Sequence, residues 1–282
     1  MNKWFVGARP RTLPAAVAPV LVSTALAASD ANFAMAGLAL MVSLALQVGV
    51  NFANDYSDGV KGTDDNRVGP TRLVASGLAT ANSVKKAAFI SFAVAAVVGL
   101  VLALLTSLWL IAVGAAAILA AWTYTGSKRP YGYIGFGEIS VFLFFGLVAT
   151  MGSYYVQTEK ITWQSFVVAI PMGSLSCALL AINNLRDRAQ DELVGKRTLA
   201  VRLGDAGARK LFIALLLLAH VSALAVSGEN TLITLALLPL TLIIANQVRA
   251  GVTGPALIPL LGKTGQLQLW FGVVFSIALA LN

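Results

Sequence analysis

Charged side chains are scarce in this sequence of 282 residues, in which Asp, Glu, Lys and Arg together make up 11%. Soluble globular domains carry about 25%. Hydrophobic residues reach 58%, and the mean hydropathy is +0.81. This composition excludes an ordinary soluble domain and predicts a protein that lies largely in lipid.

Cysteine and histidine occur once each. The single Cys177, inside an apolar run, excludes a disulfide framework and a metal site built on thiolates. We interpret His220, which lies away from the acidic clusters described below, as a packed side chain or a hydrogen-bonding contact between helices. The sequence also lacks a Walker motif, a dinucleotide fingerprint and a metalloprotease motif, so those enzyme classes are not indicated.

Apolar runs recur along the chain with about the 20 residues that a helix needs to cross ~30 Å of hydrocarbon. They are continuous rather than alternating, which favours helices over a membrane barrel. We therefore predict an all-α polytopic membrane protein with about nine transmembrane helices and a single domain, 1–282. The runs are 12–28, 35–53, 87–105, 108–125, 138–157, 164–183, 211–227, 231–247 and 266–282.

The basic residues predict the orientation of these helices, because cytoplasmic loops of membrane proteins are rich in Lys and Arg. With the N-terminus in the cytoplasm, 19 of the 20 Lys and Arg fall on the inner side, and only Lys160 lies outside. This topology accounts for the net charge of +8, so we expect no nucleic-acid partner. The inner segments are 1–11, 54–86, 126–137, 184–210 and 248–265.

The acidic residues are even fewer, yet they are concentrated, since seven of the 12 Asp and Glu fall in two short clusters. The clusters close the second and the sixth apolar run, so both runs are expected to point the same way. This placement suggests two pseudo-repeat halves, about 12–125 and 138–247, followed by a final helix, 266–282. The clustered acids are Asp55, Asp58, Asp64, Asp65, Asp187, Asp191 and Glu192.

Each cluster forms a polar stripe if its run continues as a helix. Asn54 and Asp58 would then stand one turn apart with Asp55 adjoining, and Asn184, Asp187 and Asp191 would follow one face. Carboxylates gathered at the edge of a low-dielectric region repel one another, and a hard cation removes that conflict. Mg²⁺ favours one or two carboxylates together with phosphate oxygens. The stripes therefore predict a site for Mg²⁺ and a diphosphate on the cytoplasmic side.

Basic residues follow both clusters and supply donors for a phosphate group. Glycines also break the helix after the first cluster, at Gly59, Gly62, Gly69 and Gly77, so this segment is expected to cover the site as a mobile lid. The candidate cations are Lys61, Arg67 and Arg72 after the first cluster, Lys196 and Arg197 after the second, and Lys128 and Arg129 after Tyr124.

These motifs resemble those of the UbiA superfamily of intramembrane aromatic prenyltransferases, and most closely its 1,4-dihydroxy-2-naphthoate branch in menaquinone biosynthesis. The resemblance covers most of the chain. The aspartate motifs are typical of the superfamily, whereas two other stretches, 129–132 and 195–199, indicate the naphthoate branch. The matching segments are 9–14, 54–58, 69–72, 124–126, 129–133, 137–138, 183–187, 191 and 195–202.

The resemblance implies helices around a central cavity, with Mg²⁺ and a polyprenyl diphosphate at its cytoplasmic end, in the plasma (inner) membrane of a bacterium. The implied reaction joins the allylic cation to the naphthoate ring, and the ring carboxylate leaves as carbon dioxide. This sequence departs from the superfamily pattern at the third acid of the first motif. Gly62 stands at the position of that acid, and Asp64 follows two residues later.

We assign roles to the motif residues as follows, with the division of the basic residues between diphosphate and carboxylate left open. Catalysis in the metal–diphosphate site is assigned to Asn54, Asp55, Asp58, Asp187 and Asp191. Metal binding is assigned to Asp55, Asp58, Asp64, Asp187 and Asp191. Substrate binding is assigned to Lys61, Arg67, Arg72, Tyr124, Lys128, Asn184, Lys196 and Arg197.

Two other functions are compatible with the pattern. An aromatic acceptor such as 4-hydroxybenzoate or homogentisate would use the same metal motifs. A secondary transporter is a remote alternative, because transporters place their ion and substrate sites near the middle of the bilayer. Here the acids lie at the ends of the runs, which favours the enzyme.

Overall fold

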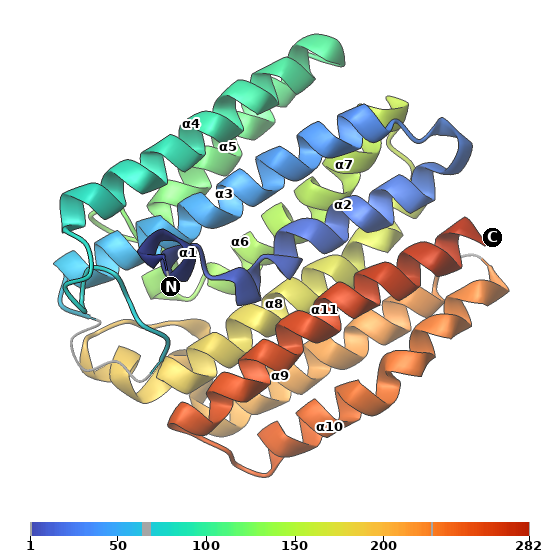
Figure 1. Cartoon of the computed structure of the whole chain (residues 1–282). Helices are drawn as coiled ribbons and strands as arrows, with labels where there is room; N and C mark the ends of the chain where they lie inside the picture. Colours follow the sequence, from blue (N-terminus) through green and yellow to red (C-terminus); the bar gives the residue numbers. More distant parts are fainter. Residues whose placement is uncertain (1, 64–68, 227, 282) are drawn as a thin grey trace.

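The computed structural model describes residues 2–63, 69–226 and 228–281, with the side chain of Glu229 also outside the description. Over these residues all regular structure is helical and no strand occurs, which confirms the all-α prediction. The long helices lie roughly side by side, with α4 and α5 at one edge of the bundle and α10 at the opposite edge (Figure 1).

The order of the helices follows the apolar runs. The longer elements are α2 (Pro14–Ala27), α3 (Phe33–Val60), α4 (Ala81–Leu105), α5 (Trp109–Thr123), α6 (Gly137–Val141), η4 (Phe142–Val148), α7 (Ala149–Thr158), α8 (Trp163–Leu193), α9 (Leu199–Leu224), η5 (Glu229–Leu237), α10 (Leu238–Arg249) and α11 (Leu257–Ala280). The short elements are α1 (Lys3–Ala8), η1 (Pro10–Thr12), η2 (Ala28–Asp30), η3 (Tyr131–Ile134) and η6 (Gly254–Ala256).

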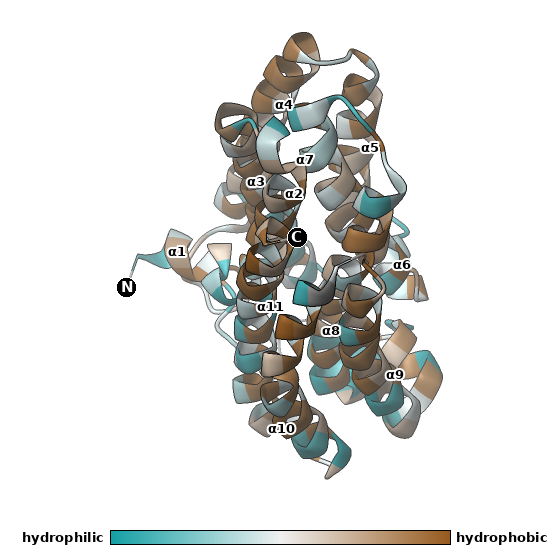
Figure 2. Ribbon diagram, turned by 90° about the vertical axis from the view of Figure 1, so that its right-hand side faces the viewer, coloured by the Kyte–Doolittle hydropathy of each residue, from teal (hydrophilic) through white to brown (hydrophobic). Residues whose placement is uncertain are grey.

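The helices have the length and the surface of membrane spans. In the described part of the chain, six are long and apolar enough to cross a bilayer, and the bent pair Lys3–Thr12 and Pro14–Asp30 makes seven if it is one span. Helix α5 is shorter, and α11 is not among the six. Hydrophobic residues predominate along the helices (Figure 2), and large ones such as Phe33, Ile90 and Leu104 are exposed on the surface. The protein is therefore an integral membrane protein, whereas nine spans and a cytoplasmic N-terminus stay predictions.

Two packed groups of helices make up the bundle. One core joins α2, α8, α9, α10 and α11, and a second joins α3, α4 and α5; a smaller cluster packs α7 against α3 and α4. His220 of α9 contributes to the first core through a hydrogen bond between its Nε2 and Oγ1 of Thr241 in α10 (2.9 Å). This contact confirms the interhelical role expected for that residue. Cys177 is buried in α8 and forms no disulfide.

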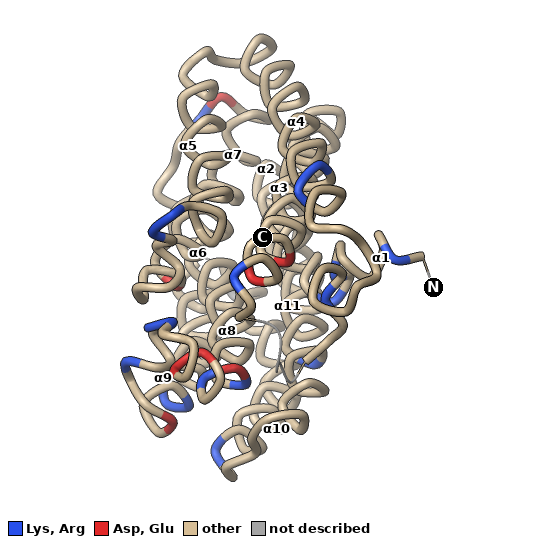
Figure 3. The backbone as a smooth tube through the Cα atoms, turned by 90° about the vertical axis from the view of Figure 1, so that its left-hand side faces the viewer, with Lys and Arg blue, Asp and Glu red and all other residues tan. Residues whose placement is uncertain are grey.

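The charged residues mark one end of the bundle. At this end α3 and α8 finish, and α4, α9 and α11 begin (Figure 1). Figure 3 views the molecule from that side and shows Lys, Arg, Asp and Glu around these helix ends. The described acids of both clusters, Asp55, Asp58, Asp187, Asp191 and Glu192, thus lie at the same end, as expected for two helices that run in the same direction.

A close crossing holds the segment α6–η4–α7 against α8. η4 is π-helical, and a Cβ atom on Gly146 would lie 2.6 Å from Cα of Gly173 in α8. Only hydrogen fits between the two backbones at this point. Small residues at such crossings let membrane helices approach closely.

Replacing Gly146 with alanine should therefore destabilise the protein by about 1–3 kcal/mol, the usual cost of overpacking. The expected readout is a lower Tm in detergent. Gly152→Ala in α7 is the matched control, because a Cβ there meets open space. Equal Tm values for the two variants would contradict the close crossing.

Candidate active site

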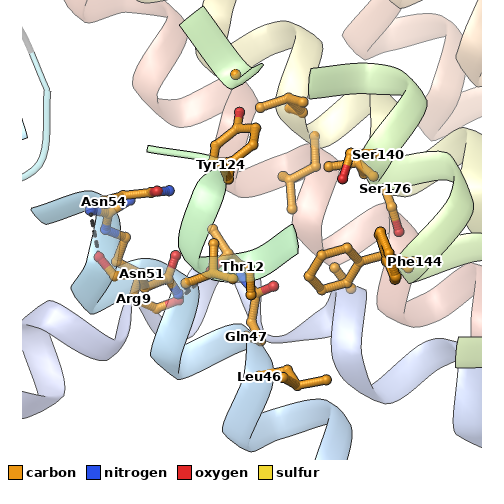
Figure 4. A pocket seen from close by; sticks show the side chains of 18 of the residues that line it. Arg9, Thr12, Leu46, Gln47, Asn51, Asn54, Tyr124, Ser140, Phe144 and Ser176 are labelled. Carbon is orange, nitrogen blue, oxygen red and sulfur yellow. Dashed lines mark hydrogen bonds between the residues drawn. The ribbon is translucent and has the colours of Figure 1, made fainter. Parts of the chain in front are cut away.

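A cavity of about 890 Å³ opens between the two groups of helices. Apolar side chains line much of it, among them Leu46, Val50 and Phe144. Polar side chains gather toward the charged end, from α3, α8 and the loops beside them. Figure 4 shows Asn51 and Asn54 of α3 near Tyr124, with Phe144 and Ser176 farther along the space. The cavity is thus polar at the charged end and largely apolar over the rest of its length.

Helix α3 contributes a polar stripe to this cavity. It extends to Val60, so Asn54 and Asp58 lie one turn apart on the cavity wall, as predicted. Two further residues, Gln47 and Asn51, extend the stripe at helical spacing. The side-chain nitrogens of both donate to Oγ1 of Thr12, at 2.9 and 3.1 Å. These contacts attach the N-terminal segment to the cavity wall.

Asp55 is placed differently from the other described acids of the predicted site. It is fully buried but does not line the cavity. Its carboxylate accepts hydrogen bonds from the backbone N–H groups of Leu73 (2.8 Å) and Val74 (3.1 Å). One residue along a helix turns the side chain by about 100°, so Asp55 points at the loop while Asn54 and Asp58 point at the cavity. The placement argues against Asp55 as a metal ligand and makes it the anchor of the loop 69–79.

Asp58 is a buried acid with partners from several segments of the chain. It is 5% exposed, and its Oδ1 accepts hydrogen bonds from the hydroxyl of Tyr133 (2.5 Å) and from Nζ of Lys196 (3.0 Å). Nη2 of Arg72 lies 3.7 Å from Oδ2 of the same carboxylate. Lys196 also lies 3.9 Å from Asp191. Asp58 therefore joins α3 to three loops and, through Lys196, to the acids of α8.

Helix α8 supplies the second stripe. It extends to Leu193, and Asn184, Asp187 and Asp191 all line the cavity, as predicted. Nδ2 of Asn184 donates to Oε1 of Glu138 (3.1 Å). Both carboxylate oxygens of Asp187 accept from Arg186, each at 2.7 Å. The two predicted stripes thus face one cavity from two helices.

The predicted basic residues divide into two groups. Arg72 and Lys196 line the cavity and are buried. Lys61, Lys128 and Arg197 are exposed and do not line it. Arg67 and the predicted metal ligand Asp64 lie outside the described residues.

Lys61 and Arg197 instead hold the loops around the site. Nζ of Lys61 donates to the backbone oxygens of Thr125 (2.8 Å) and Ser127 (3.3 Å), next to Tyr124. The backbone N–H of Arg197 donates to the backbone oxygen of Tyr133 (2.8 Å). Burial lowers the pKa of Lys61; Asp58 opposes this shift, and Lys196 adds to it. Roles in substrate binding for Lys61, Lys128 and Arg197 gain no support from these positions.

Tyr124 lines the cavity directly after α5, and its ring lies edge-on to the ring of Tyr131, with 5.5 Å between the ring centroids. Beside it, Oγ1 of Thr125 donates to Oδ1 of Asn54 (2.7 Å). The turn after α5 therefore orients the amide of Asn54 toward the cavity.

Several site residues escaped the prediction from sequence. Tyr133 and Arg186 both lie inside recognised motifs. The partner of Tyr133, Asp58, is distant in the sequence, and Arg186 pairs with its neighbour Asp187, which had been assigned to the metal. Gln47 and Asn51 had a usable signal, because polar residues seldom recur every four positions in an apolar run. Glu138 had the signal of an acid within a predicted span.

The comparisons with known proteins match this architecture. The sequence pattern of the UbiA prenyltransferase family matches residues 16–256. The chain belongs to the UbiA prenyltransferase family. The chain is 51% identical to the 1,4-dihydroxy-2-naphthoate octaprenyltransferase of Mycobacterium tuberculosis, over 99% of this chain and 97% of that protein. It is 38% identical to the enzyme of the same name from Haemophilus influenzae, over 100% and 97% of the two chains.

A solved structure shares the fold of this UbiA family member. The UbiA homologue of Archaeoglobus fulgidus bound to GPP and Mg²⁺ superposes with a TM-score of 0.73 over the full length of both chains, at 14% identity. A likeness at this identity establishes the fold alone. It agrees with the helical bundle described above.

The donor set of the cavity fits Mg²⁺ chemically. Asp58, Asp187 and Asp191 supply carboxylates, and Asn54 and Asn184 supply amide oxygens, which are the ligands that Mg²⁺ prefers. Among the described residues, however, no three acids converge closely enough to hold a metal by themselves. Such a site fits an ion that takes its remaining ligands from a phosphate group.

The anchoring role of Asp55 leads to a stability prediction. Asp55→Ala leaves the buried N–H of Leu73 and the part-buried N–H of Val74 without this partner, so we expect a loss of roughly 2 kcal/mol. The measurements are Tm in detergent and the rate of proteolytic cleavage within residues 69–79. Asp30→Ala is the control, since Asp30 forms an exposed pair with Lys160 (2.9 Å) that contributes little. Unchanged Tm and cleavage in Asp55→Ala would show that the loop is held by other contacts.

Proposed function

We propose that this UbiA family member transfers a polyprenyl group from a polyprenyl diphosphate to 1,4-dihydroxy-2-naphthoate, with release of diphosphate and carbon dioxide, in menaquinone biosynthesis. The observation that carries the proposal is the 51% identity, over nearly the whole of both chains, to a protein of that named activity. The cavity supports it independently, because it combines a charged end with a long apolar space. A prenyl diphosphate likewise joins a charged diphosphate group to a long apolar chain.

The charged end of the cavity is suited to the leaving diphosphate. Asp58, Asp187 and Asp191, with Asn54 and Asn184, are the residues that would hold Mg²⁺. When bound there, the ion would neutralise the negative charge that develops on the diphosphate. Arg72 and Lys196 line the same end and would donate hydrogen bonds to the diphosphate oxygens. The loop anchored by Asp55 positions Arg72 for this role.

The rest of the cavity is suited to the carbon chemistry. Apolar walls from α3, η4 and α8 accept the prenyl chain and keep water from the allylic cation. The electron-rich ring attacks that cation, and the carboxylate then leaves as carbon dioxide. No side chain therefore has to remove a ring proton. The protein acts by stabilising the leaving group and by positioning the two substrates.

We further propose that the protein spans the bacterial plasma membrane with its charged end on the cytoplasmic side. The strong bias of Lys and Arg toward the predicted inner segments supports this orientation. We also retain the two pseudo-repeat halves as a proposal, which the parallel course of α3 and α8 supports.

An activity assay tests the proposed reaction. Purified protein with Mg²⁺ and a polyprenyl diphosphate should consume 1,4-dihydroxy-2-naphthoate and release carbon dioxide in equal amounts. The reaction should stop when the metal is removed with a chelator and resume when Mg²⁺ is restored. Turnover of 4-hydroxybenzoate in place of the naphthoate would overturn the proposed acceptor but not the prenyl transfer.

The two stripes are tested by matched amide substitutions. Asp58→Asn and Asp187→Asn keep the shape of the side chain but remove the charge that attracts a cation. Each should lower kcat/KM by about 100-fold or more at limiting Mg²⁺, the effect of losing one group that stabilises developing charge. Added Mg²⁺ should partly restore the activity of the variant that binds the ion more weakly.

The control for both is Asp30→Asn, which lies at the opposite end of α2 from the predicted site and should retain full activity. A folded protein is checked by Tm in each case. Near-normal prenyl transfer by both site variants at limiting Mg²⁺ would refute the two-stripe site.

A further inference from the structure

Arg186 is a buried cation without an assigned role in the proposed reaction. It lies on α8 between Asn183 and Asp187, lines the cavity, and has a side chain only 1% exposed. Its Nε and Nη2 donate to the two oxygens of Asp187, and Nη2 also donates to Oδ1 of Asn183 (2.9 Å). Its Nη1 is buried and has no hydrogen-bond partner among the described residues.

An unpartnered Nη1 is unusual for a buried arginine. Nearly all buried polar groups in proteins are hydrogen-bonded, and Nη1 carries two N–H donors. Since the other nitrogens of the guanidinium are fixed by Asp187 and Asn183, the group is held rigidly with one side free. Because Arg186 lines the cavity, this fixed donor lies beside the space that a ligand would occupy.

The charge balance around Arg186 favours a single carboxylate as that ligand. Asp187 already balances most of the guanidinium charge, so the remaining attraction suits a group with one negative charge. A diphosphate carries several charges, and Arg72 and Lys196 already meet at Asp58 to serve it. The acceptor of the proposed reaction carries one carboxylate on its ring.

An arginine that is already paired with Asp187 also suits a carboxylate that must leave as carbon dioxide. Because the group must leave as carbon dioxide, a strong ion pair would stabilise the starting carboxylate and slow the reaction. The pair with Asp187 weakens the hold of Arg186 on a second carboxylate. Recognition without a strong ion pair is therefore compatible with turnover.

We propose that Nη1 of Arg186 binds the carboxylate of the aromatic acceptor and thereby selects an acidic ring over a neutral one. The inference rests on the proposed function and deepens it. It also predicts the source of selectivity, because an acceptor without a carboxylate leaves the buried donor unpartnered.

The test compares an acidic ligand with a neutral one in the same variant. Arg186→Gln should raise KM for 1,4-dihydroxy-2-naphthoate by about tenfold or more, as expected for the loss of a charge-assisted hydrogen bond. The inhibition constant of 1,4-dihydroxynaphthalene, which lacks the carboxylate, should change less than about twofold. KM for the polyprenyl diphosphate should stay near the wild-type value.

Arg188→Gln is the matched control, because Arg188 lies on the same helix, pairs with Glu192 (3.6 Å) and does not line the cavity. It should leave all three constants unchanged. If Arg186→Gln does not accumulate in membranes, Arg186→Lys is measured in the same way, since it retains the charge but loses the fixed fork of donors.

The outcomes separate the two proposals. No turnover of the naphthoate by wild-type protein would overturn the proposed function. Wild-type turnover combined with equal weakening of the acidic and the neutral ligand in Arg186→Gln would overturn the role of Arg186 alone. A selective rise in KM for the diphosphate would assign the guanidinium to that substrate and would also reject the inference.

Discussion

A buried carboxylate at Asp58 is the constraint on which the site depends. A charge removed from water is costly unless opposite charges and hydrogen bonds compensate it. Tyr133, Lys196 and Arg72 provide that compensation, and each belongs to a different segment of the chain. Satisfying one acid therefore draws three loops onto the end of α3 and closes the charged end of the cavity.

The pairing of charges also prepares the site for its substrates. Asp58 holds Lys196 and Arg72, and Asp187 holds Arg186, so acids and cations neutralise each other before any ligand is present. A metal–diphosphate pair brings both signs of charge into the same space. The carboxylate of Asp58 and its two cations would then exchange partners with little change in net charge, which would keep the cost of binding low in a medium of low dielectric constant.

The division of the cavity into a charged end and an apolar body follows from the positions of α3 and α8. Both helices are apolar over most of their length and polar in the last turns, and both finish at the same end of the bundle. In the proposed reaction the walls would separate the prenyl chain and the reactive cation from water, while the leaving group would remain near the polar loops. Asp55 adds to this arrangement by fixing the loop that carries Arg72. Gly59 allows the same loop to approach, because a Cβ there would lie 2.5 Å from Val74.

Composition and hydrophobic run length were enough to predict an all-α membrane protein, because a chain in lipid must satisfy its backbone within helices. Motif spacing was enough to predict the two stripes, since residues three or four apart share one face of a helix. The sequence did not decide which neighbour in a motif faces the cavity. Asp55, predicted as a metal ligand, accepts hydrogen bonds from a loop and does not line the cavity. It also did not separate the basic residues that line the site from those that support it, or reveal Tyr133 and Arg186 as parts of it. Those assignments depend on contacts between distant segments, and only the packed helices determine which of those segments meet.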